Sequence, residues 1–174
     1  MCESDHRILQ ALAGALRLLI CGDVPDAVKG LAQSYKERIK RRIDQAGLGE
    51  LVEWLGHIPE EKVAELFSRA AALVVPYEAG PTISTSGVII RAMVYGVPVI
   101  ASAVRGFTDE IKDGETGLLF REKDAAELAD KIRELIGDDQ LAEKLGKNAY
   151  DHVAKEHSWQ NVARLVNRHD EALK

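Results

Sequence analysis

The chain has 174 residues, of which 46% are apolar and 29% charged, a composition that fits one globular domain and excludes a disordered chain. Its net charge of −5 lacks the basic excess of nucleic-acid binders, so no nucleic-acid partner is expected. Cys2 and Cys21 have neither metal-ligand nor disulfide-framework spacing. The hydropathy of the sequence indicates neither a membrane-spanning stretch nor a signal peptide. We therefore expect a cytoplasmic protein.

The start of the chain predicts a helix, a strand and a second helix. A short helix fits residues 5–15. The continuous apolar run Leu18–Cys21 is typical of a strand that is buried on both faces. A long amphipathic helix is expected over residues 27–46, because its apolar side chains share one face and Gly47 is a suitable C-terminal stop.

The strand-then-helix pattern recurs along the rest of the chain. Further strands are expected at 51–55, 73–75, 97–101 and 118–120. Pro59 opens one helix, and others are expected near 87–95, 124–136, 139–154 and 158–172. This alternation predicts an α/β fold, a Rossmann-like three-layer structure with one parallel sheet between helices. Ligands of such sheets bind at the carboxyl ends of the strands, so the loops there matter most.

The loop before the helix at 87–95 is the most informative of these. Residues 77–87 read Tyr-Glu-Ala-Gly-Pro-Thr-Ile-Ser-Thr-Ser-Gly, and small hydroxyl residues with glycine allow a backbone to approach a bulky anion. The free N–H groups of the helix start would then hold a phosphate. The residues predicted to bind it are Ser84, Thr85, Ser86 and Gly87. An ordinary N-cap is the alternative, because serine and threonine cap helices routinely.

Two other loops follow predicted strands. In the loop Gly56–Pro59, we expect Ile58 to contact a nucleobase through its backbone, whereas His57 is interpreted as a surface residue. After the strand at 97–101, Arg105 either pairs with a phosphate or is exposed to solvent. No residue cluster indicates a metal or another cofactor, and no residue is assigned as catalytic.

The helix at 27–46 also carries a run of basic residues, from Lys36 to Arg42. The run lies on the polar face and is interrupted by an acid, so a solvated face is the main interpretation and contact with a membrane surface is the alternative. Trp54 and Trp159 alternate with apolar neighbours and are expected in the core.

Six short motifs, taken in chain order, carry a resemblance to a known enzyme family. They are Gly22–Pro25, Val52–Pro59, Ala71–Pro76, Ala92–Ser102, Asp113–Leu119 and Ser158–Trp159. Together they resemble the C-terminal domain of the family 4, or group 1, retaining glycosyltransferases with the GT-B fold, and the resemblance covers nearly the whole chain. It implies a single donor-binding domain over residues 1–174, which holds the nucleoside diphosphate of a nucleotide-sugar.

Two positions depart from the family's pattern. Family members place two glutamates eight positions apart around the donor loop, one for the transferred sugar and one for the ribose. Aligned on Ala92-Met93, these positions are Ile83 and Arg91 in this chain. A subgroup of the family is similar in having a Ser/Thr-Ser-Gly loop, which would place Thr85-Ser86-Gly87 at the diphosphate. The family's Arg and Lys that neutralise the diphosphate would lie upstream of residue 1.

The resemblance therefore implies a parent glycosyltransferase, in which an N-terminal domain or a partner chain holds the acceptor. We expect the chain alone not to be a competent enzyme, because it would lack that half. The alternative is a non-catalytic or degenerate domain that binds nucleotides or a partner. The sequence does not predict the nucleotide, the sugar or the acceptor.

Overall fold

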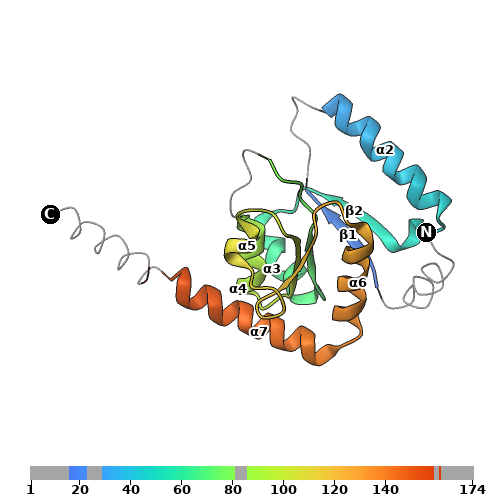
Figure 1. Ribbon diagram of the computed structural model, residues 1–174. Helices are drawn as coiled ribbons and strands as arrows, with labels where there is room; N and C mark the ends of the chain where they lie inside the picture. Colours follow the sequence, from blue (N-terminus) through green and yellow to red (C-terminus); the bar gives the residue numbers. More distant parts are fainter. Residues whose placement is uncertain (1–15, 23–28, 81–85, 159–160, 162–174) are drawn as a thin grey trace. The chain divides into compact units, whose positions relative to one another are not determined.

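The computed structural model describes residues 16–22, 29–80, 86–158 and 161 (Figure 1). The chain divides into two compact units, residues 1–63 and 64–174. The helices predicted at 5–15 and 158–172 lie almost wholly outside the described residues. Among the described helices, none is long and apolar enough to cross a membrane.

The first unit contains a two-stranded parallel sheet. Its elements are β1 (Leu18–Cys21), α2 (Lys29–Gln45), η2 (Gly49–Leu51) and β2 (Val52–Gly56). Strand β1 pairs with β2. The prediction that β1 is buried on both faces was wrong: Leu18 is 53% exposed and Cys21 is exposed as well. An apolar run shows that a segment can be buried, but not whether neighbours cover it.

Trp54 of β2 is half-buried rather than in the core, which corrects the expectation for this residue. The Nζ atoms of Lys36 and Lys40 lie 4.9 Å and 5.8 Å from the centroid of its ring. Both lysines belong to the basic run of α2. Their ammonium groups lie over the face of the aromatic ring, where a cation is attracted to it, so part of this run has a structural role.

The second unit is built around a three-stranded parallel sheet in the order β3-β4-β5. Its strands are β3 (Leu73–Val75), β4 (Val99–Ser102) and β5 (Leu118–Phe120). All four residues of the central strand β4 are buried, as expected for a strand with neighbours on both edges. The predicted α/β class and the parallel pairing of the strands are thus confirmed within each unit.

Helices α4 (Gly87–Val94) and α6 (Ala125–Ile136) contact the strands of this second sheet. The same unit contains α5 (Phe107–Glu110) and α7 (Asp139–Glu156), whereas α3 (Glu60–Arg69) begins in the first unit. Alternate strand residues form one apolar cluster with α6 and α7, composed of Ile100, Leu118, Phe120, Leu135 and Leu145. Helix α4 contacts β3 and β4 and buries Ile89 and Met93. The short helix α5 was not predicted.

Two glycines allow α7 to approach the end of α4 closely. A Cβ atom at Gly146 would lie 2.1 Å from the carbonyl oxygen of Gly96, far inside van der Waals contact. Gly96 has a φ of 66°, a left-handed conformation that glycine adopts without strain. These two glycines therefore allow α7 to pack closely against α4, the helix whose start belongs to the candidate site described below.

Candidate functional site

The candidate site is the carboxyl edge of the sheet β3-β4-β5, together with the start of α4. Strand β3 leads into residues 76–80, β4 into residues 103–106 and β5 into residues 121–124. Parallel strands end at one edge, and a helix that follows such a strand starts there too. The loops on this edge are joined to one another by specific contacts.

Ser102, at the end of β4, joins the first two loops. Its side chain is buried, and its hydroxyl donates a hydrogen bond of 2.6 Å to the carbonyl oxygen of Tyr77. The ring of Tyr77 lies 5.4 Å from the ring of Phe107, in α5. A buried hydroxyl needs such a partner, and here the bond fixes the first residues of the loop after β3.

The loop after β5 holds the same segment from another side. Glu122 accepts a hydrogen bond of 3.0 Å from the backbone N–H of Ala79, and Lys123 lies 3.2 Å from the carboxylate of Glu78. The Lys123–Glu78 pair is exposed on both sides, and exposed pairs contribute little. The bond from Glu122 to the backbone is therefore the contact that we expect to position the loop.

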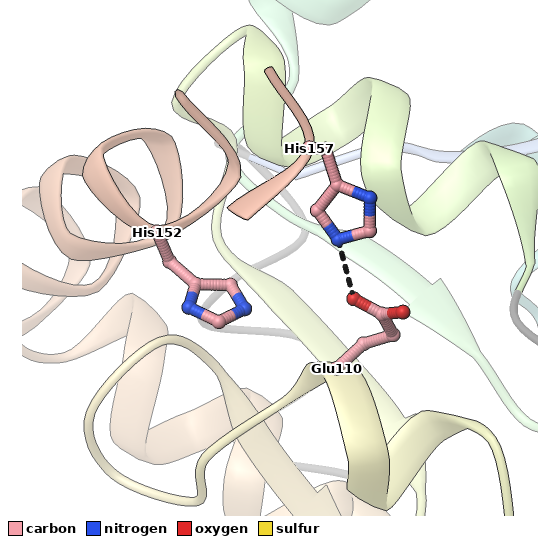
Figure 2. A group of neighbouring side chains, drawn as sticks. All are labelled: Glu110, His152 and His157. Carbon is pink, nitrogen blue, oxygen red and sulfur yellow. Dashed lines mark hydrogen bonds and ion pairs between the residues drawn. The ribbon is translucent and has the colours of Figure 1, made fainter. Parts of the chain in front are cut away.

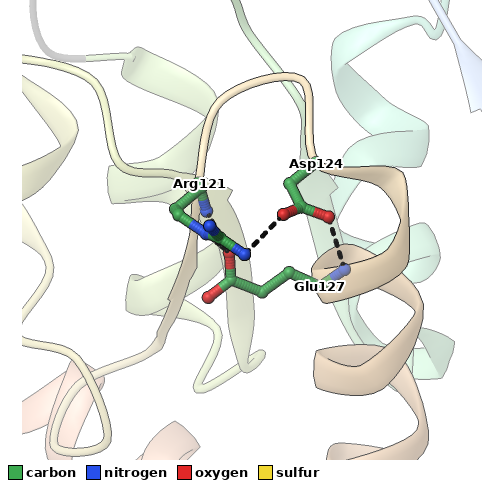
Figure 3. A network of polar contacts seen from close by, with 3 residues as sticks. All are labelled: Arg121, Asp124 and Glu127. Atoms are coloured by element: carbon green, nitrogen blue, oxygen red, sulfur yellow. Dashed lines mark hydrogen bonds and ion pairs between the residues drawn. The ribbon is translucent and has the colours of Figure 1, made fainter.

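A network of three side chains fixes the β5 loop to α6 (Figure 3). Asp124 caps α6 by accepting a bond of 2.9 Å from the N–H of Glu127, and it lies 2.7 Å from the guanidinium of Arg121. The carboxylate of Glu127 accepts bonds of 2.8 Å and 2.9 Å from the backbone N–H and the Nε of Arg121. Those two bonds lower the pKa of Glu127, the backbone bond most, and the same side-chain bond raises the pKa of Arg121.

The start of α4 has an unused capping position. Ser86 is the N-cap residue, with φ −88° and ψ 120°, but its side chain makes no capping hydrogen bond. Gly87 is exposed, and none of the residues that the structure describes lies within 4 Å of the position that a Cβ atom would occupy. The first turn of α4 carries no acidic residue. Within the described part of the chain, the positive end of this helix therefore faces no acidic or capping side chain, and Ser86 does not form the ordinary cap that was the alternative interpretation.

The predicted site residues fall in different parts of the chain. Ser86 and Gly87 begin α4, and Arg105 is exposed in the loop after β4, so these three belong to the same unit. Ser84 and Thr85 lie outside the described residues. Ile58 is half-buried in the first unit, two residues after β2. The roles assigned to all six residues stay predictions, as does the single domain over residues 1–174.

Ser102 and Glu122, whose bonds position the loop after β3, were not among the predicted site residues. A polar residue directly after a buried strand is the signal that could have indicated Ser102. Nothing in the sequence pairs Glu122 with Ala79, because that contact depends on which strands are neighbours.

Comparison with known proteins gives a consistent result. Residues 5–152 match the family described as glycosyl transferases group 1. A D-inositol 3-phosphate glycosyltransferase of Corynebacterium aurimucosum is 30% identical over 159 residues, which cover 91% of this chain and 36% of that relative. The chain thus spans about a third of the length of this curated relative.

Two solved structures share the fold. Sucrose-phosphate synthase from Thermosynechococcus elongatus matches with a TM-score of 0.74 and 31% identity, over 97% of this chain and 41% of that one. The Anabaena protein HepE in complex with UDP also matches with a TM-score of 0.74, at 19% identity, over 99% of this chain and 54% of that one.

Proposed function

This chain belongs to the group 1 glycosyl transferases, whose relatives share the GT-B fold, and we propose that it is the part that binds the nucleoside diphosphate of a sugar donor. The observation that carries the proposal is the open start of α4, at the carboxyl edge of the sheet. Its uncapped serine and exposed glycine leave backbone N–H groups available to a phosphate, in the direction that the helix dipole favours.

The surrounding loops support the same proposal. Ser102 and Glu122 bind the backbone of Tyr77 and Ala79, at the start of the loop that leads toward α4. Arg105 supplies an exposed cation on the next loop and would pair with a phosphate oxygen. That HepE was solved with UDP favours a nucleoside diphosphate as the ligand.

In the intact enzyme, this part would support retaining transfer to an acceptor that another domain or chain holds. The leaving nucleoside diphosphate gains charge in the transition state, and the helix start and Arg105 would stabilise that charge. Closure over the donor and positioning of the acceptor would come from the partner, because the matched relatives are longer than this chain. Ile58 would contact the base through its backbone.

A second function, binding without catalysis, is favoured by one observation. Arg91 stands where the family has a glutamate, and it is half-buried in the last turn of α4. A cation there interacts favourably with the negative end of the helix, which is a structural role and not that of a carboxylate that accepts bonds from a sugar.

Titration calorimetry with matched ligands tests the donor proposal. We expect nucleoside diphosphates to bind at least about tenfold more tightly than the corresponding nucleosides, since the phosphates would make charge-assisted bonds to the helix start. Equal affinities for a nucleoside and its diphosphate would show that α4 does not hold a phosphate. A panel of bases in the same experiment identifies the nucleotide.

A further inference from the structure

Glu110, His152 and His157 form a cluster that the proposed function does not use (Figure 2). Glu110 is the last residue of α5, His152 lies in α7, and His157 directly follows α7. The Nε2 atom of His157 is 2.9 Å from a carboxylate oxygen of Glu110, and the two imidazole rings are 6.4 Å apart. One ligand atom from each residue lies within 4.8 Å of the others.

Two imidazoles and a carboxylate are the ligand set that zinc and similar divalent ions favour. Bonds of about 2.0–2.1 Å in a tetrahedral site place ligand atoms about 3.3 Å apart. The observed spacing is up to about 1 Å or more wider than that, so the three side chains would have to move closer together when they bind an ion. All three residues stand at or near helix ends, and His157 is the most accessible of them.

The charge around the cluster also favours a cation. The pocket that holds the cluster contains more carboxylates than lysines, and the two lysines, Lys112 and Lys155, lie 3.8 Å and 3.4 Å from the carboxylates of Glu115 and Glu156. Exposed acids alone would attract cations only diffusely. The two imidazoles make this cluster different, because they bind a metal through nitrogen in their neutral form.

We propose that Glu110, His152 and His157 bind a divalent transition-metal ion of the zinc class, with water completing its coordination. The ion would replace the bond between His157 and Glu110 and would link the C-terminal end of α5 to that of α7. Helix α5 directly follows the loop that carries Arg105, so the ion would also limit the motion of that loop. The proposal stands independently of donor binding.

The test uses the full chain, freed of metal by a chelator that is then removed, and titrated with Zn²⁺ by calorimetry. We expect one ion per chain, and a rise in the thermal midpoint of roughly 5–10 °C when free Zn²⁺ is about a hundred times Kd. His152→Ala, His157→Ala and Glu110→Gln should each weaken binding at least about tenfold. A control variant at a histidine outside the cluster, His57→Ala, should bind as the unchanged chain does.

A second readout needs no variant. With Co²⁺ in place of Zn²⁺, the imidazole proton resonances of His152 and His157 should shift or broaden before those of His57. Binding that the cluster variants leave unchanged, Co²⁺ effects that begin at His57, or no binding at one ion per chain would overturn the proposal. Circular dichroism of each variant shows whether its fold is intact, and the Co²⁺ experiment decides the matter if a variant does not fold.

Discussion

Replacing Ser86 with aspartate should change ligand binding and stability in opposite directions. Ser86 occupies the N-cap of α4 without capping it, and aspartate is among the best N-cap residues. Its carboxylate would accept a bond from the first turn and interact favourably with the helix dipole. The variant should therefore be more stable by about 0.5–1 kcal/mol, which would raise the thermal midpoint by roughly 1–4 °C.

The same carboxylate would stand beside a phosphate bound at this helix start. Two unit charges about 5 Å apart repel by about 0.8 kcal/mol in water and about 3 kcal/mol at the effective dielectric constant of a protein surface. The expected loss is thus about 1–3 kcal/mol, or roughly a 5- to 150-fold rise in Kd for a nucleoside diphosphate. A nucleoside, which has no phosphate, should bind Ser86→Asp almost as it binds the unchanged chain.

Ser158→Asp is the matched control for this experiment. The hydroxyl of Ser158 also accepts a bond from a backbone N–H, that of Asn161, at 3.2 Å. This variant adds the same charge to the chain at a position outside α4. Unchanged affinity of Ser86→Asp for nucleoside diphosphates, or an equal loss in Ser158→Asp, would refute the assignment of the phosphate to α4.

Three further predictions concern packing, pH and turnover. Gly146→Ala should lower the free energy of unfolding, measured in denaturant titrations, by about 1–2 kcal/mol. The reason is that a clash of the new methyl group with Gly96 outweighs the gain of about 1 kcal/mol in helix propensity. A more stable variant would contradict the close packing of α4 and α7. Because the pKa of Glu127 is lowered, its carboxylate stabilises the fold fully above the ordinary pKa of 4.5, and this stabilisation is lost as the pH falls through the lower value. Glu127→Gln should therefore be less stable than the unchanged chain near pH 7 and equally stable in strong acid. A difference in thermal midpoint that stays constant with pH would argue against this. The purified chain, supplied with labelled nucleotide-sugars and mixed acceptors, should show no acceptor-dependent transfer. Positioning of the acceptor can lower the barrier by about 7–11 kcal/mol, and this contribution would be missing. Turnover well above the rate of donor hydrolysis would show that this part of the enzyme suffices.

Much of the fold follows from local patterns in the sequence. The apolar run predicted a strand at 97–101, and the strand lies at 99–102. The helices that begin after Asp124 and Asp138 are capped by those side chains, so their starts were predicted closely. The exposure of β1 and the partial burial of Trp54 were not predictable, because both depend on which side chains of other elements cover them.

The candidate site was predictable only in part, for a related reason. The start of α4 is a local feature, and the sequence indicates it by Ser86 and Gly87. The bond from Glu122 to Ala79 joins residues 43 positions apart, and the pair Glu110–His157 joins residues 47 apart. Such contacts depend on the strand order and on the packing of α7, which no short motif specifies.

The central claim, that α4 begins at a phosphate site, is tested most directly by a residue-level titration. The chain has a mass of 19.1 kDa, which suits amide NMR with ¹⁵N labelling. Titration with UDP should shift the amide resonances of Gly87 and Val88 most, and titration with uridine should leave these two nearly unchanged. If UDP shifts amide resonances elsewhere in the chain but not those of Gly87 and Val88, the phosphate does not bind at the start of α4.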